Sequence, residues 1–528
     1  MDPVQANSPA VVATPSEELI DALQHARAFD HAVKYIRLLQ THISWVLLTG
    51  DYAYKIKKPV NFGFVDFSTL ALRKFFCEEE LQLNRRFASD IYLESVAIRD
   101  DGSGPTFFGE GRIVDYAVKM REFDQQDLLS AYASDGRLST AHIDVIATEI
   151  ARLHEIAKPA DAHSDFGATE QLRYRSSENF EQIEKHLGAD HLPARFAGFR
   201  ESYLAQIEQL EPTFEQRRHQ GFVRDCHGDL HLDNMAMLDG QLTLFDCIEF
   251  NSSLRWIDCI SEAAFVAMDL QARGYPAFGW RFINQYLEIN GDYAAMPLLR
   301  YYLIYRALVR AKVAVLGASL PGDSEQHLDK ALSYIDLAMR WADDRRPGLV
   351  LMHGLSGSGK STSAARLAEA IGAIQVRSDV ERKRLFGYRP QQSSGAGLEG
   401  GIYGASSSDA SYSRLLEITD EIIRSGFCVI VDASFLQAER RAAFLQLASD
   451  HSLRAVVIDC EAPTELLRQR IVERIGDASE ASLQVLDRQL VVRQPLTSSE
   501  RGQAYVLSCP VDGLASAQLE QIARWLAG

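Results

Sequence analysis

Residues 349–371 read LVLMHGLSGSGKSTSAARLAEAI, an apolar run followed by a glycine-rich turn and a segment of helical composition. The turn GLSGSGKS matches the pattern G-x-x-x-x-G-K-[ST] in full. In such a loop the glycines let backbone N–H groups wrap a phosphate, and the dipole of the following helix adds to the attraction. The pattern therefore predicts a nucleotide-binding loop between a buried strand and a helix. The residues expected to contact the nucleotide are Gly354, Leu355, Ser356, Gly357, Ser358, Gly359, Lys360, Ser361 and Thr362.

Four residues of this region have separate expected roles. Lys360 bridges the terminal phosphates, and the hydroxyl of Ser361 ligates Mg²⁺. Asp432 ends the apolar run CVIVD, where an acid that supports Mg²⁺ is expected. Asp379 follows a short apolar run and can accept the proton of an attacking hydroxyl. A helix N-cap is the structural alternative for Asp379.

Several arginines could hold anionic groups beside this loop. Arg377 and Arg382 flank Asp379 and are candidates for binding an anionic substrate. In RQRIVER, Arg470 and Arg474 stand four residues apart and share one helical face. That spacing suits a lid that clamps phosphates during transfer, although a solvated helix face explains it as well.

The surrounding residues alternate between apolar runs and helical segments. GLVLMHG, FCVIVDAS and RAVVIDC are continuous apolar runs with helices between them, which favours a parallel sheet covered on both faces. The Gly- and Ser-rich segment 391–413 is expected to be a mobile substrate loop. Charge and a Pro-Gly pair in RWADDRRPG (340–348) mark the domain boundary before this region.

The motifs of residues 348–528 resemble those of the P-loop kinase-type ATPase family, which includes polynucleotide 5′-kinases, zeta toxins and chloramphenicol phosphotransferases. The resemblance rests on GLSGSGKST, VRSDVERKRLFGY, the GGIY loop, VIVDASF, CEAPTELLRQRIVERI and VVRQP. It implies a P-loop NTPase fold, ATP as the donor and Asp379 as the base. Family members phosphorylate very different hydroxyls, so the resemblance does not name the acceptor.

A second stretch, VRDCHGDLHLDN (223–234), holds His227 and His231 four residues apart. Two histidines at this spacing suit zinc when they lie on a helix. Gly228 follows His227 and disfavours a helix interior, and strand-like runs lie on both sides. No further Cys or His stands at an obvious ligand spacing in the sequence. The stretch is therefore predicted to be a catalytic loop.

The spacing H-G-D-x-x-x-x-N is that of the catalytic loop in kinase-like phosphotransferases. Asp229 would accept the proton of the substrate hydroxyl, and Asn234 would ligate Mg²⁺. Asp246 closes the apolar run LTLF, where a second metal-binding acid is expected. His227 is expected to brace the loop through hydrogen bonds, whereas His231 has no assigned role.

A lysine that contacts the phosphates and its glutamate partner are expected upstream. Glu80 lies on the apolar face of a predicted helix, where an acid is costly unless it is paired. Lys55 and Lys57 project from the same side of a predicted strand, and Lys55 is favoured because the small Ala53 gives adenine room to approach. A surface salt bridge between hairpin and helix is the alternative. The predicted hairpin and helix are ISWVLL (43–48), AYKIKK (53–58) and RKFFCEEELQLNRRF (73–87).

The motifs CHGDLHLDN and FDCIEF resemble the aminoglycoside phosphotransferase and choline-kinase-like family. The resemblance runs from about residue 30 to 340 and implies a kinase fold without the eukaryotic activation segment. It places the hinge against adenine at MREF (120–123) and the nucleotide-covering loop at LTGDY (48–52). Asp258 is expected to pair with Arg255 in a structural role.

The composition is that of a globular protein, with 46% hydrophobic and 24% charged residues among 528. No apolar run is long enough for a membrane span, and the N-terminus lacks the pattern of a secretory signal. Seven scattered cysteines form no CxxC pair, which favours a reducing cytoplasm. The predicted fold class is α/β and α+β, with a bilobal protein-kinase-like fold followed by a P-loop NTPase parallel sheet. The expected parts are a disordered tail (1–29), an N-lobe (30–125), a mainly helical C-lobe (126–345) and a P-loop kinase domain (346–528).

The net charge of −17, most of it before residue 346, disfavours a polyanionic partner for that part. The leading prediction is a bifunctional phosphotransferase with two separate ATP sites. Each site would move the γ-phosphoryl of ATP–Mg²⁺ to a hydroxyl of a small, sugar- or aminoglycoside-like molecule. Two alternatives stay open: a nucleotide-sensing regulator with one inactive module, and a nucleic-acid 5′-hydroxyl kinase.

Overall fold

The computed structural model describes residues 17–63, 65–161, 163–317, 324–390, 392, 405–473, 479–511 and 513–527. The chain divides into two compact units, each assembled from separate segments. Unit 1 comprises Met1–Leu138, Arg224–Ile257 and Gly317–Ser324. Unit 2 comprises Ser139–Val223, Asp258–Leu316 and Glu325–Gly528. The borders of these units do not coincide with those of the predicted domains.

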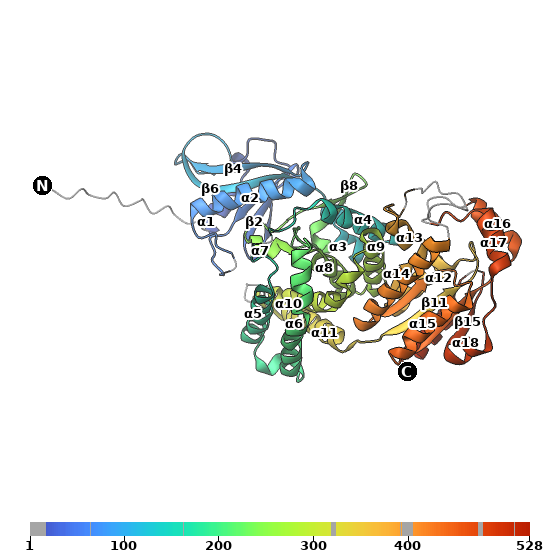
Figure 1. The fold of residues 1–528 in the computed structure, drawn as a ribbon. Helices are drawn as coiled ribbons and strands as arrows, with labels where there is room; N and C mark the ends of the chain where they lie inside the picture. Colours follow the sequence, from blue (N-terminus) through green and yellow to red (C-terminus); the bar gives the residue numbers. More distant parts are fainter. Residues whose placement is uncertain are drawn as a thin grey trace. The chain divides into compact units, whose positions relative to one another are not determined.

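Unit 1 is built on a six-stranded antiparallel sheet in the order β1-β2-β3-β6-β4-β5. Figure 1 labels β2, β4 and β6 of this sheet. The hairpin predicted from ISWVLL and AYKIKK is confirmed as β2–β3, with Leu48 opposite Ala53. Along β3, Tyr54 and Ile56 join an apolar cluster on one face, whereas Lys55 and Lys57 face the other side. The strands are β1 (Arg37–Gln40), β2 (Ser44–Leu48), β3 (Tyr52–Lys57), β4 (Tyr92–Asp100), β5 (Pro105–Thr106) and β6 (Arg112–Arg121).

Helix α2 (Leu70–Ala88) covers the lysine face of this sheet and contacts β4 and β6. The predicted helix over 73–87 is thereby confirmed, and its first turn is capped by Thr69, whose hydroxyl accepts from the backbone N–H of Leu72 at 3.2 Å. The opposite face carries α1 (Glu17–Leu23) and the 3₁₀ turn η1 (Ala26–Ala28).

The prediction of a disordered tail over 1–29 is wrong for residues 17–29. Ile20 and Leu23 lie three residues apart on α1 and are buried in the apolar cluster of the sheet, together with Ala28 and Phe29. The segment is ordered because burial of these apolar side chains stabilises it, although its overall composition is polar. Residues 1–16 lie outside the described part of the chain.

The remaining elements of unit 1 surround the predicted catalytic loop. The loop runs from β7 to the hairpin β8–β9, which turns at Asp239 and Gly240 with φ values of +51° and +77°. Aspartate and glycine tolerate this left-handed backbone, as a two-residue hairpin turn requires. The elements are η2 (Gln125–Asp127), α3 (Leu129–Ser134), β7 (Val223–Asp225), η4 (Leu232–Asn234), β8 (Met235–Leu238), β9 (Gln241–Leu244), α7 (Ser252–Arg255) and β10 (Trp256–Asp258).

Unit 2 begins with a helical part, as the 3.6-residue apolar periodicity predicts. Helix α9 packs against α4 and α8 there, and also contacts the sheet domain that follows in the chain. No helix of the described residues is long and apolar enough to cross a membrane. The elements are α4 (Thr140–Ile156), α5 (Thr169–Leu187), η3 (Ala189–His191), α6 (Phe196–His219), α8 (Cys259–Ala272), α9 (Pro276–Asn290), η5 (Tyr293–Ala295), α10 (Met296–Gly317) and α11 (Ser324–Asp343).

The second part of unit 2 is the predicted parallel sheet, confirmed with five strands in the order β12-β13-β11-β14-β15 (Figure 1). Its strands are β11 (Gly348–His353), β12 (Ile374–Arg377), β13 (Cys428–Asp432), β14 (Ala455–Cys460) and β15 (Tyr505–Cys509). Each side of the sheet is apolar because both sides are covered by helices.

Helices α12 and α19 cover one face of this sheet, and α14 and α15 contact its strands as well. The loop predicted over 391–413 is wrong in its last part, because α14 already begins at Ala405; residues 391 and 393–404 lie outside the described residues. The helices are α12 (Lys360–Ile371), α13 (Ser378–Leu385), α14 (Ala405–Arg424), α15 (Ala438–Asp450), α16 (Thr464–Glu473), α17 (Leu483–Val492), α18 (Ser498–Gln503) and α19 (Ser516–Ala527).

Candidate active sites

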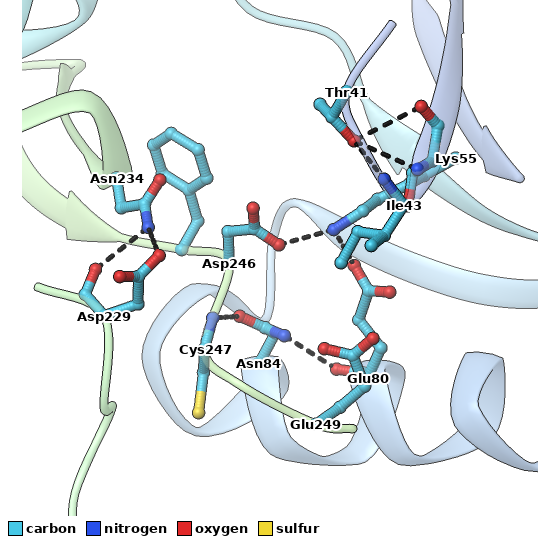
Figure 2. Close-up of polar contacts among 12 residues, drawn as sticks. Thr41, Ile43, Lys55, Glu80, Asn84, Asp229, Asn234, Asp246, Cys247 and Glu249 are labelled. Carbon is cyan, nitrogen blue, oxygen red and sulfur yellow. Dashed lines mark hydrogen bonds and ion pairs between the residues drawn. The ribbon is translucent and has the colours of Figure 1, made fainter. Parts of the chain in front are cut away.

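Unit 1 holds a cluster of two lysines and three carboxylates. Lys55 Nζ lies 2.8 Å from Glu80 Oε1 and 2.5 Å from Asp246 Oδ1 (Figure 2). Lys57 Nζ lies 2.7 Å from Glu80 Oε2 and also contacts Glu249. Glu80 therefore pairs with both lysines, as expected for residues two apart on one strand face. The two lysines differ in surroundings, because Lys55 reaches Asp246 whereas Lys57 is fully buried.

Helix α2 positions this cluster with two residues one turn apart. Asn84 lies four residues after Glu80, and its Nδ2 donates to the backbone oxygen of Glu80 at 2.9 Å. Its Oδ1 accepts from the backbone N–H of Cys247 at 2.8 Å (Figure 2). The helix thus holds both the glutamate and the segment that follows Asp246. The sequence analysis missed Asn84, although its helical spacing from Glu80 was a usable signal.

The catalytic-loop backbone depends on a glycine and a histidine. Gly228 has a φ of +89°, and a Cβ there would lie 2.9 Å from the carbonyl oxygen of Leu254. His227 Nδ1 accepts from the backbone N–H of Asp229 at 3.4 Å, so Nε2 carries the proton that it donates to Phe245 O at 2.9 Å. The predicted bracing role of His227 is confirmed. Neither His227 nor His231 lies in an α-helix.

Asp229 and Asn234 meet directly across the loop. Asn234 Nδ2 donates to the backbone oxygen of Asp229 at 2.9 Å and to its Oδ2 at 3.1 Å. His231 Nε2 lies 3.4 Å from the same carboxylate oxygen, and its Nδ1 lies 3.5 Å from Asp233 Oδ2. His231, which had no predicted role, therefore lies between two carboxylates. The amide nitrogen of Asn234 faces Asp229, which makes its oxygen the atom suited to ligate a cation.

Asp246 adopts a left-handed backbone with a φ of +63°, which is uncommon for a residue other than glycine. Its backbone N–H donates to the hydroxyl of Tyr92 at 3.1 Å. Its side chain is 42% exposed, so a carboxylate is offered to solvent beside Lys55. Figure 2 shows Asp246 between Lys55 and the Asp229–Asn234 pair. Six predicted residues thus gather in one unit: Lys55, Lys57, Glu80, Asp229, Asn234 and Asp246.

Burial and ion pairing together set the charge of the cluster. Burial acts against the charged form of Lys55, but Asp246 and Glu80 outweigh it and raise the pKa of Lys55 well above its usual value. Burial likewise acts against the carboxylate of Glu80, but the two lysines lower its pKa to about 2. Burial raises the pKa of Glu249, which Lys57 opposes. Lys55 and Glu80 are accordingly both charged at neutral pH.

The position predicted for the nucleotide-covering loop is wrong. The turn LTGDY lies at the end of β3 remote from Lys57, where the backbone N–H groups of Thr49 and Gly50 donate to Glu122 Oε2 at 2.8 and 2.7 Å. The turn at the lysine end is the one between β1 and β2, because Ser44 pairs with Lys57. The reason is the sheet order, in which β3 is the third strand and not the second.

The expected pair between Asp258 and Arg255 is also wrong. Asp258 caps helix α8 by accepting from the backbone N–H of Ile260 at 3.0 Å. Its two oxygens receive Arg217, with distances of 2.7 and 2.8 Å to Nε and Nη2. Arg217 also bonds to both carboxylate oxygens of Asp292 at 2.7 Å. Asp258 keeps a structural role, but with a partner that lies 41 positions before it.

The P-loop of unit 2 has the backbone that its glycines predict. Gly354 has a φ of +143°, and a Cβ there would lie 2.4 Å from the carbonyl oxygen of Cys460. Lys360 Nζ donates to the carbonyl oxygen of Leu355 at 2.7 Å. Gly354, Leu355 and Ser358 are buried in the loop. The other predicted residues line a cavity of about 740 Å³: Ser356, Gly357, Gly359, Lys360, Ser361 and Thr362.

The same cavity is lined by Asp379, Arg377, Arg382 and Asp432. Arg382 Nη1 lies 2.9 Å from Asp379 Oδ1, and Arg377 Nε lies 3.7 Å from Asp432 Oδ2. Ser361 lines the cavity with Asp432, and its hydroxyl acts to lower the pKa of that carboxyl. Asp379 is the second residue of α13 and Arg377 is its N-cap, so the alternative of an N-cap role for Asp379 is wrong. Arg377 and Asp432 are the last residues of β12 and β13, and Asp379 and Arg382 follow β12 on α13, so the cavity lies at the carboxyl ends of the parallel strands.

Further arginines complete the cavity wall. Arg470 donates to the carbonyl oxygen of Gly357 at 3.3 Å, so it lies on the P-loop as a clamp would, whereas Arg474 lies outside the described residues. The sequence analysis missed Arg366, Arg440 and Arg488, which also line the cavity. Their motifs carry no recognisable spacing, and only the fold brings them together. Among the described lining residues, seven are Lys or Arg and two are Asp.

The two acids of the cavity have opposite pKa shifts. Burial acts to raise the pKa of Asp379, but Arg382 and a hydrogen bond from Ser479 outweigh it, and the pKa of Asp379 is lowered. Burial raises the pKa of Asp432 despite the opposing effects of Arg377 and Ser361. Asp379 is therefore ionised at neutral pH, as a group that accepts a proton must be.

Comparisons with known proteins found a match to the P-loop segment and a match to most of the chain. A family model described as an AAA domain matches residues 349–496, the segment that holds the P-loop. The protein "Uncharacterized protein Rv2004c" of Mycobacterium tuberculosis (strain ATCC 25618 / H37Rv) is 31% identical over 453 residues, which cover 85% of this chain and 89% of that protein.

Two solved structures are similar to separate parts of the fold. A choline/ethanolamine kinase family protein from Mesorhizobium loti shares 11% identity with a TM-score of 0.37, covering 61% of this chain and 94% of that one. A sugar kinase from Janibacter sp. HTCC2649 shares 20% identity with a TM-score of 0.27, covering 34% of this chain and 95% of that one. These likenesses concern the fold alone.

Proposed function

We propose that this chain, which belongs to the family of protein Rv2004c of Mycobacterium tuberculosis, is an ATP- and magnesium-dependent phosphotransferase with two separate nucleotide sites. One observation carries the proposal: each compact unit contains, within itself, a lysine and two aspartates that fit the roles of phosphate contact, metal ligand and base. In unit 1 these are Lys55, Asp246 and Asp229. In unit 2 they are Lys360, Asp432 and Asp379.

In the unit 1 site, we assign Lys55 to the phosphates and Asp229 to the proton of the acceptor hydroxyl. Asn234 and Asp246 fit Mg²⁺, which prefers oxygen ligands, because each offers a side-chain oxygen and Asp246 lies between Lys55 and the Asp229–Asn234 pair (Figure 2). The bound ion would neutralise phosphate charge and hold the γ-phosphoryl in line for attack. Glu80 orients Lys55, and Lys57 supports Glu80 from the buried side.

In the unit 2 site, we assign Lys360 to the terminal phosphates and Asp379 to the acceptor proton. The hydroxyl of Ser361 and the carboxylate of Asp432 line the same cavity, and both are oxygen ligands that fit a magnesium ion. Arg470, with Arg474 as a predicted companion, clamps phosphates from the P-loop side. Fixed positive groups such as these arginines stabilise the negative charge that develops on the leaving group during phosphate transfer.

The charge of the unit 2 cavity favours an acceptor that is itself anionic. Arg377 and Arg382 lie on the side of Asp379, and Arg440 lines the cavity with its guanidinium 4.2 Å from the ring of Tyr412. Arginines at this density are suited to carboxylate or phosphate groups. We therefore assign the unit 2 site to a small hydroxyl compound that bears such a group. For the division of the chain, we propose three segments: an N-lobe (30–125), a C-lobe (126–345) and a P-loop kinase domain (346–528).

The experiment that tests this proposal uses the full chain and radiolabelled ATP with a panel of neutral, cationic and anionic hydroxyl compounds. Asp229→Asn and Asp379→Asn should each lower the rate of one phosphorylation by about 10²-fold or more and leave the other unchanged. The reason is that each substitution removes the base of one site. Nucleotide binding should persist in both variants, since neither aspartate is assigned to the phosphates.

The panel separates the alternatives as well. If one of the two substitutions leaves every turnover unchanged while its site still binds nucleotide, that module is a sensor. If a 5′-hydroxyl oligonucleotide is labelled instead, with affinity that falls steeply as salt rises, the acceptor is nucleic acid. Failure of both sites to transfer phosphate to any acceptor or to water would refute the proposal.

A further inference from the structure

Helix α9, from the helical part of unit 2, makes specific polar contacts with the strand that leads into the P-loop cavity. Asn284 Nδ2 donates to the carbonyl oxygen of Ala373 at 2.9 Å, and its Oδ1 accepts from the backbone N–H of Gln375 at 2.7 Å. This is the pairing that a neighbouring strand would provide at the edge of a sheet. β12 is an edge strand in the sheet order, so α9 holds its free edge in place.

One turn further along α9, Glu288 reaches the cavity wall itself. Its Oε1 lies 2.9 Å from Nη1 of Arg377, and both side chains are less than one-fifth exposed. The backbone oxygen of Glu288 accepts from Arg384 Nη2 at 2.6 Å. The guanidinium of Arg384 lies over Gly291, where a Cβ would be 2.3 Å from its Nε. The end of α9 is therefore fitted to α13, the helix that carries Asp379.

Two residues of strand β12 also contact the carboxylate of Asp432. Gln375 Nε2 donates to Asp432 Oδ2 at 3.2 Å, and Arg377 Nε lies 3.7 Å from the same oxygen. At that distance Arg377 and Asp432 do not form the close charge-assisted pair that arginine makes with a carboxylate at about 2.8 Å. Arg377 makes a closer contact with Glu288, in which its Nη1 donates to Oε1 at 2.9 Å.

We propose that Glu288 is a positioning residue for the P-loop site. By holding the guanidinium of Arg377, it keeps Arg377 from closing on Asp432, and it thereby leaves that carboxylate to Ser361 and to a magnesium ion. The helical part of unit 2 is then a component of the P-loop site, although none of its described residues lines the cavity. This inference rests on the proposed function only for phosphate transfer, since its effect on magnesium-dependent nucleotide binding is independent of turnover.

The test uses the full chain with Asp229→Asn, so that phosphate transfer reports unit 2 alone. A fluorescent ADP analogue is titrated with and without Mg²⁺, and binding at the P-loop is identified by its loss in Lys360→Met. Glu288→Gln should raise the Mg²⁺ concentration for half-maximal effect by about tenfold, the size typical of residues that orient metal ligands. ADP binding without Mg²⁺ should stay the same. Glu288→Asp, which retains the charge, should give an intermediate shift.

A matched control exists in the same helix interface. Glu369 of α12 pairs with Arg281 of α9 at 2.7 Å, with similar exposure, and neither residue lines the cavity. Glu369→Gln therefore removes one ion pair between α9 and the sheet domain without altering the site. In an Arg377→Gln background, Glu288→Gln should have no further effect, because it acts only through that arginine.

The outcomes are separable. Equal Mg²⁺ shifts in Glu288→Gln and Glu369→Gln, or a shift that persists without Arg377, would overturn the positioning role while leaving the proposed function intact. Intact Mg²⁺-dependent ADP binding with no phosphate transfer would refute the proposed function but still measure the positioning role. Loss of Mg²⁺-dependent ADP binding in the parent chain overturns both.

Discussion

The two lysines of strand β3 should fail in opposite ways when each is replaced by methionine. Lys57→Met removes an ammonium group that is fully buried and leaves Glu249, itself 4% exposed, without the cation that opposes its burial. Breaking a buried ion pair from one side costs about 3–5 kcal/mol, because a charge is left in a poorly polar environment. We expect a loss of that order in the free energy of unfolding of unit 1.

Lys55→Met should cost far less stability. Glu80 keeps its contact with Lys57, and the carboxylate of Asp246 is exposed enough for water to replace the lysine. We expect a loss of about 1 kcal/mol, as for a partly exposed ion pair. Phosphate transfer at the unit 1 site should fall by about 10²-fold or more, because a fixed positive group directed at the phosphates is removed.

The stability loss in Lys57→Met should also depend on pH. Burial raises the pKa of Glu249, so this carboxyl takes up a proton in the folded state more readily than in the unfolded state. A group whose folded pKa is raised stabilises the fold increasingly as pH falls toward its unfolded value. The deficit of the variant relative to the parent chain should therefore shrink between pH 7 and about 5.

Hydrogen exchange of the β3 amides, followed by mass spectrometry, measures this local stability within the full chain. Phosphate transfer is measured in an Asp379→Asn background so that unit 2 does not contribute. The reasoning is refuted if Lys55→Met destabilises β3 more than Lys57→Met does. It is refuted equally if folded Lys57→Met loses more activity than Lys55→Met.

Three further predictions concern other parts of the chain. Gly228→Ala should lower phosphate transfer at the unit 1 site about 10²-fold, because the added methyl group displaces the loop from the carbonyl of Leu254. Transfer at the unit 2 site should not change, and a unit 1 rate equal to that of the parent chain would contradict the prediction. Arg217→Met should lower the stability of unit 2 by about 3–5 kcal/mol in urea unfolding, because two buried carboxylates lose their cation; a loss under 1 kcal/mol would show that they are solvated. Arg382→Gln should raise the pKa of Asp379 and move the acidic limb of the unit 2 pH–rate profile to higher pH, whereas an unmoved limb would exclude Asp379 as the base.

The grouping of the candidate residues at both sites could be predicted from the sequence because these residues stand in short, ordered motifs. The P-loop places a lysine and a serine at fixed positions of one turn, and the loop from His227 to Asn234 fixes a base and an amide five residues apart. In each case the backbone between them is short enough to allow few arrangements. The structure accordingly brings Asp229 and Asn234 into direct contact.

The groups that orient this chemistry could not be predicted in the same way. Glu249 contacts Lys57 across 192 positions, and Asn84 binds Cys247 across 163. The helical spacing of Asn84 points to Glu80, but the local pattern of neither Asn84 nor Glu249 identifies its distant partner. Glu80 was predictable only because an acid on an apolar helical face demands compensation, which reveals that a partner exists but not which lysine supplies it.

The misplaced nucleotide-covering loop has a related cause. A hairpin pattern predicts two paired strands and a turn, yet it does not say whether another strand precedes the pair in the sheet. The short β1, with only four residues of low burial, lacks the alternation that would indicate it. Once β1 is added, the turn at LTGDY moves to the end of β3 remote from Lys57, and Glu122 takes its free N–H groups.

Both candidate sites share one design, in which a motif supplies the proposed reacting groups and a helix from elsewhere in the chain contacts them or their neighbours. In unit 1 the helix is α2, through Glu80 and Asn84; in unit 2 it is α9, through Asn284 and Glu288. Such residues do not touch the assigned substrates, but a displacement of about 1 Å in a reacting group is enough to cost much of the rate. Substitutions in α2 and α9 should thus resemble active-site substitutions in kinetics while leaving the motifs untouched.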